Sequence, residues 1–249
     1  MTLDYPKHKN ILLRILKDIF FDTSLSPYLG FKGGTAALMF YDLARNSVDI
    51  DLDLLDESKG QEVFEKIQKI AGQYGRIIDS RIKRFNLITV LSYDLKSQNI
   101  KIETNRRDFG SKYELKTLLG ISMLVMAKED MFANKLMAMY ERIGKTSRDV
   151  YDVYFFTKNN WPINKKLVED RAKMSFREVL VKCLKLLEKM DNRHILDGLG
   201  EMLTESQKDW ARAKLRTETI FLLKAWLESE RGSSNIAITS SWRFLNFQR

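Results

Sequence analysis

The segment VDIDLDLL, residues 48–55, alternates acidic with apolar side chains. Successive side chains of a β-strand point to opposite faces, so this pattern predicts a strand with one apolar and one acidic face. The acidic face carries Asp49, Asp51 and Asp53. Carboxylates held this close repel one another and raise one another's proton affinity unless a cation lies between them. The segment therefore predicts a strand that packs on one face and binds a cation on the other.

The rest of the chain predicts two regions of different composition. Before about residue 116, helical patterns alternate with β-rich runs. The helical patterns cover residues 8–21, 35–44 and 59–75. The β-rich runs at residues 84–95 and 99–105 are predicted to form a hairpin. From about residue 117 onward Met, Lys, Leu and Glu predominate, and helical patterns cover residues 121–143, 147–158, 168–190 and 207–230. We therefore predict an α/β (α+β) protein with a small mixed sheet in residues 1–116 and a helical domain in residues 117–232. Residues 233–249 are predicted to be a flexible tail or a vector-derived remnant.

Magnesium is the cation that such a row of carboxylates predicts, because Mg²⁺ takes oxygen ligands at short distances. The chain offers little for zinc, since His8, His194 and Cys183 are widely scattered. Cys183 has the spacing of a buried helix face, and both histidines are expected at the surface. A pair of aspartates on Mg²⁺ leaves coordination positions open for the phosphate oxygens of a nucleoside triphosphate.

A glycine pair precedes the acidic strand. Gly33, Gly34 and Thr35 lie between an apolar extended piece and the start of a helix. Without side chains, glycines let a phosphate approach the backbone, and the N–H groups at a helix start then face the anion. The pattern is neither a Walker loop nor a dinucleotide-binding fingerprint. On its own a glycine pair is more typical of a tight turn, and it is the nearness to the aspartates that favours phosphate binding.

Composition limits the partners and the compartment. The formal charge of +9, from 42 basic and 33 acidic residues, favours a polyanionic partner such as a nucleotide or nucleic acid, although solubility alone accounts for such a charge as well. The N-terminal segment carries charges inside its apolar run, so it is not a signal peptide. No apolar run is long enough to predict a membrane span. The single cysteine excludes an internal disulfide and fits a reducing cytoplasm.

The order of these motifs resembles a known superfamily. Gly34-Thr35, followed after an interval by Asp49-Ile50-Asp51-Leu52, is similar to the signature of the nucleotidyltransferase (polymerase-β-like) superfamily. More narrowly, residues 32–38 and RNSVDIDLDL resemble the AbiEii/AbiGii toxin family, the toxin halves of type IV toxin–antitoxin and phage-defence systems. KLMAMYERIGKTSRDVYDVYFF, residues 135–156, is similar to the later motifs of that family. The resemblance covers roughly residues 28–157.

The resemblance implies roles for particular residues. It implies an N-terminal nucleotidyltransferase lobe and a C-terminal helical lobe, with Asp49, Asp51, Lys135 and Asp149 as the catalytic residues. The residues expected to bind the nucleotide are Gly33, Gly34, Thr35, Arg45, Ser47 and Lys135. The metal ligands would be Asp49, Asp51 and a third carboxylate, for which Glu103 is preferred and Asp94 is the competitor. Asp53 is expected to be supporting or solvated, and Asp152 to pair with the preceding arginines.

The implied activity is a magnesium-dependent transfer of a nucleoside monophosphate from an NTP to an acceptor hydroxyl, with tRNA as the expected acceptor. A cognate antitoxin protein is the other expected partner, and the expected location is the cytoplasm. A track for RNA is predicted from basic residues of the helical half, namely Lys165, Lys166, Arg171, Lys173, Arg177, Arg212, Lys214 and Arg216. Three alternatives remain at this stage: a small acceptor such as an antibiotic, phosphoryl transfer, and a non-catalytic binding protein on the same fold.

Overall fold

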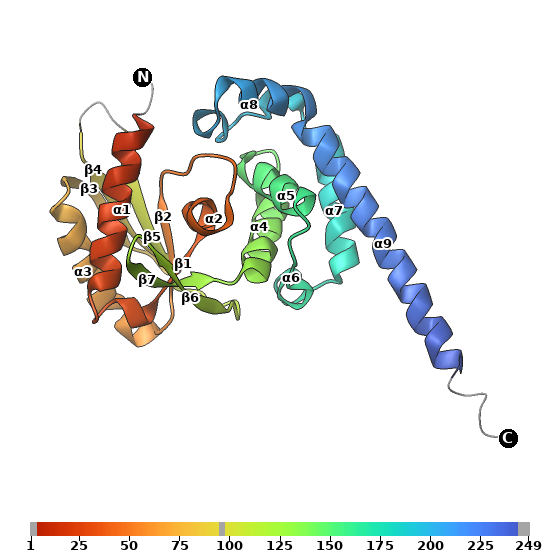
Figure 1. The fold of residues 1–249 in the computed structure, drawn as a ribbon, viewed down its shortest axis with the longest axis horizontal. Helices are drawn as coiled ribbons and strands as arrows, with labels where there is room; N and C mark the ends of the chain where they lie inside the picture. The colour runs from red at the N-terminus through yellow and green to blue at the C-terminus, as the bar shows by residue number, and fades with distance from the viewer. Residues whose placement is uncertain (1–3, 95–97, 244–249) are drawn as a thin grey trace. The chain divides into compact units, whose positions relative to one another are not determined.

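The computed structural model describes residues 4–94 and 98–243. The chain divides into two compact units, Met1–Met131 and Phe132–Arg249. The first unit carries the strands and the second is helical (Figure 1). Within the described residues, none of the helices combines the length and apolar character needed to cross a membrane.

One sheet of seven strands, counted over the described residues, forms the centre of the first unit. In chain order these are β1 (Leu29–Lys32), β2 (Ile50–Leu54), β3 (Arg76–Ile82), β4 (Asn86–Ser92), β5 (Ile100–Asn105), β6 (Tyr113–Leu118) and β7 (Ile121–Met126). The spatial order is β3-β4-β5-β2-β1-β7-β6. The pairs β2–β5 and β1–β7 are parallel and the other pairs are antiparallel, so the sheet is mixed as predicted.

The two faces of β2 are covered differently. Ile50 and Leu52 are fully buried. The amphipathic helices α1 (Tyr5–Phe21) and α3 (Gly60–Gly72) pack against each other and against the strands on one side of the sheet, while α2 (Gly33–Tyr41) packs on β1 and β2 from the other (Figure 1). Because side chains alternate along a strand, the aspartates of β2 point away from its apolar face. Their face receives the beginning of α2.

The second unit is built from helices packed around an apolar core. Its elements are most of α4 (Lys128–Arg142), then α5 (Arg148–Lys158), α6 (Lys165–Ala172), α7 (Phe176–Lys189), α8 (Glu205–Trp210) and α9 (Arg216–Arg243). Helix α9 packs against α5 and α7, and its Trp226 contacts Phe132 of α4 and Phe176 of α7. Cys183 is fully buried in α7, and burial raises the pKa of its thiol to about 12, which confirms the predicted core position.

Residues 121–126 form strand β7, so the prediction of a helix from residue 121 is wrong. The short apolar run ISMLVM fits a buried strand or a buried helix equally well. The deciding signal is the turn before it: Leu119 and Gly120 have φ angles of 51° and 78°. Two successive residues of positive φ form the tight turn that matches the twist of a β-hairpin. Leucine is unusual at the first position of such a turn, so the turn is not recognisable from the sequence.

The β6–β7 hairpin also moves the boundary between the units. The structure divides the chain after Met131, later than the predicted boundary at residue 116, because β7 pairs with β1 and joins the first sheet. At the other end, helix α9 continues to Arg243, through much of the segment predicted to be a tail. Residues 244–249 of that predicted tail lie outside the described residues.

His8 is fully buried in α1, so the prediction of a surface position for it is wrong. Its Nδ1 lies 2.8 Å from the Tyr93 hydroxyl and its Nε2 lies 2.9 Å from the carbonyl oxygen of Val48. A carbonyl only accepts, so Nε2 carries the proton and Nδ1 accepts from Tyr93. Burial lowers the pKa of His8 and favours this neutral form. His194, in contrast, is exposed as expected.

Candidate functional site

The turn from β1 into α2 brings backbone against the acidic face of β2. Gly33 has a φ of 78°, a conformation that side chains disfavour. A Cβ atom placed on Gly33 would collide with the Asp51 carboxylate. A Cβ on Gly34 would lie 2.8 Å from Arg45 Nη2 and 2.9 Å from Ser47 Oγ. The glycine pair is therefore required by close approach, as well as by the turn itself.

Thr35 fixes this turn to the segment that leads into β2. Its hydroxyl is buried, lies 2.9 Å from Ser47 Oγ and donates a hydrogen bond to the carbonyl oxygen of Asp49. Arg45 is also buried, and its Nη1 donates to the carbonyl oxygen of Asn46 at 2.8 Å. The structure thus gathers the predicted nucleotide-binding residues of the first unit around the start of α2 and the start of β2.

Helix α2 begins with its N–H groups uncapped by a side chain. Lys32 occupies the N-cap position and gives no capping hydrogen bond. The first N–H groups of a helix lack partners inside the helix and carry its partial positive charge. They lie next to Asp51, so an anion bound there would be flanked by backbone donors on one side and a carboxylate on the other.

Two strands supply the charged groups of the acidic face. Asp51 on β2 pairs in register with Glu103 on the parallel strand β5. Glu103 accepts a hydrogen bond from the Asn86 amide and forms an ion pair with Lys101, whose Nζ lies 2.6 Å from Oε2 of Glu103. Burial lowers the pKa of Lys101, but the hydrogen bond to Glu103 and the charges of Asp51 and Asp49 outweigh it, so the pKa is raised. A lysine cation therefore balances part of the acidic face.

Lys101 was missed as a site residue at the sequence level, although the signal was present. In the segment IKIET, Lys101 and Glu103 are two residues apart and therefore share one face of the strand. The competitor for the third carboxylate, Asp94, lies 2.7 Å from Lys7 Nζ in a partly exposed ion pair. The choice of Glu103 over Asp94 as a metal ligand stays a prediction.

The acidic residues of this site suit a cation that takes only some of its ligands from the protein and the others from water or substrate. Nowhere in residues 4–94 and 98–243 do three or more His, Cys, Asp or Glu side chains come close enough together to hold a metal ion by themselves. Asp49 and Asp51 supply hard carboxylate oxygens, the donor type that Mg²⁺ prefers. Mg²⁺ usually binds through one or two carboxylates together with water and substrate phosphates. The donor set therefore fits Mg²⁺ carried in with a triphosphate.

Asp53, the third acidic residue of the row, is buried and holds neighbouring side chains by hydrogen bonds, so it is not solvated. Its carboxylate is buried and accepts from Lys32 Nζ at 2.5 Å, from the Asn105 amide at 2.6 Å and from the Tyr113 hydroxyl at 2.5 Å. The Tyr113 ring lies against Gly30, where any Cβ would collide with it. Burial and then the Asp53 charge raise the pKa of Tyr113, which keeps the hydroxyl protonated as a donor.

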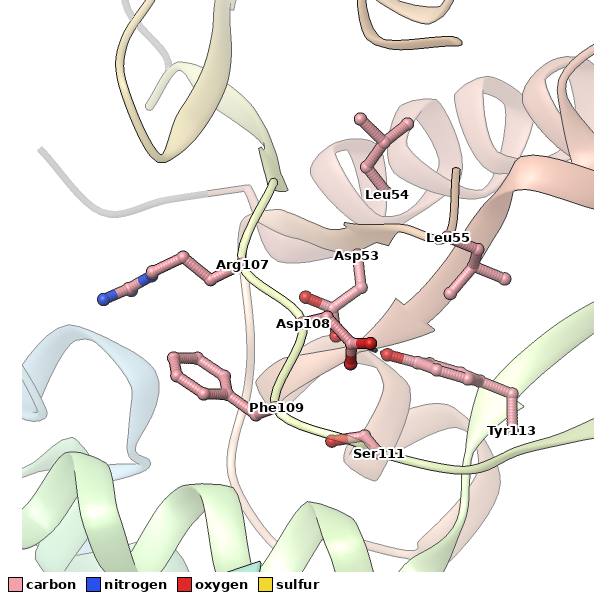
Figure 2. A pocket seen from close by; sticks show the side chains of 8 residues that line it. All are labelled: Asp53, Leu54, Leu55, Arg107, Asp108, Phe109, Ser111 and Tyr113. Atoms are coloured by element: carbon pink, nitrogen blue, oxygen red, sulfur yellow. Dashed lines mark hydrogen bonds between the residues drawn. The ribbon is translucent and has the colours of Figure 1, made fainter. Parts of the chain in front are cut away.

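A small cavity opens beside Asp53. Its volume is about 160 Å³, and it is lined by Asp53, Leu54, Leu55, Arg107, Asp108, Phe109, Ser111 and Tyr113 (Figure 2). The oxygens of Asp53, Asp108 and Tyr113 converge in it, whereas Arg107 extends away from them beside Phe109 (Figure 2). This volume is smaller than the pockets that usually enclose a whole ligand.

The second unit contains a separate charged cluster. Lys135 on α4 lies 2.7 Å from Asp152 and 3.4 Å from Asp149, both buried on α5, and Arg142 lies 2.7 Å from Asp149 Oδ2. Asp149 Oδ2 nevertheless lacks a well-formed hydrogen bond, so the Arg142 contact satisfies the distance and not the angle. The sequence predicts that Asp152 pairs with the preceding arginines, and the structure places Lys135 beside both Asp149 and Asp152. Their catalytic and nucleotide-binding roles stay predictions.

Comparisons with known proteins agree with this fold. The model of a family described as nucleotidyl transferase AbiEii toxin, type IV TA system, matches residues 14–223. The crystal structure of JHP933 from Helicobacter pylori is similar with a TM-score of 0.57 at 20% identity, over 95% of this chain and 99% of that one. A candidate nucleotidyltransferase from H. pylori is similar with a TM-score of 0.58 at 20% identity, over 92% and 98% of the two chains. Among curated proteins, no sequence matches the chain.

Proposed function

Since the chain belongs to the AbiEii nucleotidyltransferase toxin family, we propose that it transfers a nucleoside monophosphate from an NTP to the terminal hydroxyl of a tRNA. The acceptor oxygen forms a bond to the α-phosphorus of the NTP. The bond from that phosphorus to the bridging oxygen breaks, pyrophosphate leaves, and the hydroxyl proton passes to a base or to water. The products are a tRNA longer by one nucleotide and pyrophosphate.

The observation that carries the proposal is the contact between Gly33 and Asp51. It puts the uncapped start of α2 directly against a carboxylate, as a site for a metal-bound triphosphate requires. Backbone N–H groups there would hold phosphate oxygens, and Arg45 and Ser47 are packed against the same turn. When Mg²⁺ is bound to Asp49 and Asp51, it supplies charge neutralisation for the phosphate oxygens.

Lys135 is proposed to contact the triphosphate, on the strength of the family motif that contains it. Two buried aspartates hold its ammonium group in place, so its position is fixed before any nucleotide binds. A lysine acts on phosphate as a compact point charge. Asp149 is proposed as the residue that orients Lys135 or accepts the acceptor proton.

A tRNA acceptor is supported by the charge of +9 and by the family description as a toxin. Blocking or extending the acceptor end of tRNA would stop translation, which accounts for toxicity. Membership of a type IV toxin–antitoxin family also supports a cognate antitoxin as partner, and action in the cytoplasm, where tRNA is found.

The test is to incubate the purified protein with total tRNA and each α-labelled NTP in turn, with Mg²⁺ or with EDTA. We expect one NTP to label tRNA in the presence of Mg²⁺ alone, and Asp51→Ala to give no product. A parallel reaction replaces tRNA with an aminoglycoside or lincosamide. Transfer to the small molecule and not to tRNA would overturn the proposed acceptor. Labelling by γ-labelled NTP, and not by α-labelled NTP, would overturn nucleotidyl transfer in favour of phosphoryl transfer.

A further inference from the structure

Two loops of the first unit carry the same kind of sequence. The turn between β3 and β4 reads Lys83-Arg84-Phe85, and the segment after β5 reads Arg106-Arg107-Asp108-Phe109. Asn86 at the start of β4 pairs with Asn105 at the end of β5, which brings the two loops to the same end of the sheet. The amide N–H of Arg106 donates to the carbonyl oxygen of Phe85 at 2.8 Å and joins them directly.

The side chains of these loops form an Arg–Phe cluster of Arg84, Phe85, Arg107 and Phe109. The Arg107 guanidinium lies 5.3 Å from the Phe85 ring centre and 5.1 Å from that of Phe109. Arg84 lies 4.9 Å from the Phe85 ring centre. The cluster is thus an alternating series of flat cations and rings, and Figure 2 shows its Arg107 and Phe109 beside the cavity.

The cluster is open to solvent and keeps its positive charge. The Phe85 side chain is 44% exposed, and Arg84 and Arg107 are exposed as well. In the part of the chain that the structure describes, neither of these two arginines makes an ion pair, whereas the neighbouring Arg106 pairs with Glu57. An exposed phenylalanine ring beside two arginines that make no ion pair within the described residues offers flat surfaces and positive charge together, and this combination matches a ligand with flat rings and negative charge.

We propose that the Arg–Phe cluster binds unpaired nucleotides of an RNA strand by stacking bases on Phe85 and Arg107. Single-stranded nucleic acid is bound in this way, by aromatic side chains for the bases and basic side chains for the phosphates. A duplex hides the faces of its bases, so the occupant is a single-stranded end and not a paired stem. The inference rests on the proposed function in one respect: the strand bound is the acceptor.

The position of the cluster relates it to the acidic face. Glu103, in register with Asp51, lies two residues before Asn105, which is about 7 Å along the strand. Asn86, next to Phe85 in the chain, donates its amide hydrogen bond to Glu103. A nucleotide stacked on Phe85 would therefore lie within one or two nucleotides of the carboxylates, the distance expected of the bases just before the reacting 3′ end.

The experiment measures binding of a fluorescent single-stranded RNA dodecamer in EDTA, so that no transfer takes place. We expect Phe85→Ala and Arg107→Lys each to raise the Kd about 5- to 150-fold, the range of losing one stacked base. Arg107→Lys keeps the charge and removes the flat surface. Phe21→Ala is the matched control, because Phe21 is also an exposed ring, 53% exposed and 5.5 Å from Lys17 Nζ, and we expect its Kd to be unchanged.

Two further measurements separate stacking from charge and from catalysis. A 2-aminopurine base in the RNA should change its fluorescence on binding to the wild type and not to Phe85→Ala, and the same sequence in a duplex should bind independently of Phe85. Equal affinities of Phe85→Ala and wild type for the dodecamer would overturn the proposal, even if tRNA is modified normally. Phe85-dependent binding without transfer of any NMP to tRNA would instead support the cluster and overturn the proposed function.

Discussion

His8 and Val48 are joined by a hydrogen bond of 2.9 Å, which ties the first helix to the residue directly before Asp49. The neutral imidazole suits both of its partners, because it accepts from Tyr93 and donates to Val48. A protonated ring would have two donors and would turn one of them toward a hydroxyl that now donates to it. The segment that leads into the acidic strand is thus held by a group that titrates.

The first prediction is a loss of stability in mild acid that depends on His8. The pKa of His8 is lowered in the folded state. The contribution of neutral His8 to the free energy of unfolding is therefore fully present above the ordinary pKa of about 6.5, and it is lost as the pH falls through the folded pKa. Within that window the loss is at most about 1.4 kcal/mol per pH unit. Urea unfolding from pH 7.5 to 5 should show a smaller loss for His8→Gln than for wild type, with His194→Gln as control. Parallel wild-type and His8→Gln curves would contradict it.

The second prediction concerns the close approach of Gly33 to Asp51. Gly33→Ala adds a collision with the carboxylate to the strain of a positive φ, and we expect a loss of activity together with destabilisation of about 1–3 kcal/mol. Gly120→Ala is the matched control, because Gly120 has the same φ of 78° and open space where its Cβ would lie. It should show the strain without loss of activity. Equal activities of the two variants would show that the contact with Asp51 does not matter.

The third prediction is that Asp49→Ala or Asp51→Ala removes activity and leaves the fold intact. Losing a metal ligand removes several kcal/mol of charge stabilisation, which corresponds to a rate about a hundred to ten thousand times lower. The free energy of unfolding without metal should stay equal or rise slightly, because fewer carboxylates then repel one another. Circular dichroism and urea unfolding check the fold, and the tRNA labelling assay checks activity. An active Asp51→Ala variant would exclude the proposed metal site.

The fourth prediction is that Lys135→Met destabilises the protein, in addition to any effect on nucleotide use. The substitution leaves Asp149 and Asp152 buried without their lysine, and breaking such a pair removes about 3–5 kcal/mol. Lys166→Met is the control, since its partner Asp170 and Lys166 itself are exposed, and it should change stability by about 1 kcal/mol or less. Nucleotide affinity should therefore be measured on Lys135→Arg, which keeps the buried charge balanced. An unchanged NTP affinity in Lys135→Arg and in a folded Lys135→Met would remove Lys135 from the nucleotide site.

The fifth prediction is a steep salt dependence of tRNA binding. Each phosphate neutralised by a basic side chain releases counterions, so the affinity should fall by orders of magnitude from 50 to 200 mM salt for about six or more contacts. The structure reduces the set of basic residues suited to this test, because Arg171 donates a hydrogen bond to Asn134 and Arg216 donates one to the carbonyl oxygen of Met190. These two should be left in place, and Arg212→Glu with Lys214→Glu should lower the salt slope. A slope unchanged by that double reversal would place the RNA elsewhere.

The sequence was sufficient for the parts of the fold that depend on local pattern. Alternation predicts β2 and β5, and helical periodicity predicts α1, α3 and most of the helical unit. The range 168–190, predicted as one helix, is broken between α6 and α7, where Ser175 caps the second helix. The sequence failed at β7, where an apolar run fits either structure and Leu119 replaces the usual turn residue. It also failed for His8, because the α1 periodicity that places His8 on the buried stripe says nothing of the hydroxyl and carbonyl that satisfy it.

The contacts of the charged side chains could be predicted only in part. Lys101 lies on the same strand face as Glu103, as their spacing of two residues indicates, but the effect of Asp49 and Asp51 on the pKa of Lys101 depends on the parallel pairing of β2 with β5. Which aspartate meets Lys135 depends on the packing of α5 against α4, which no local pattern encodes. Residues far apart in the chain, such as Tyr113 with Asp53, were found only in three dimensions.

The parallel pairing of β2 with β5 has a consequence for how the protein folds during its synthesis. Asp51 faces Glu103 only after the intervening helix and two strands have been made and the long loop between them has closed, and parallel pairing over such a distance is slow to form. The nascent chain up to the end of β2, at Leu54, therefore carries its aspartates without the strand that completes their surroundings. Synthesis must proceed beyond Asn105 before the carboxylate face exists, and beyond Met126 before β1 gains its second neighbour. Translation itself thus sets the earliest moment at which this chain can become active.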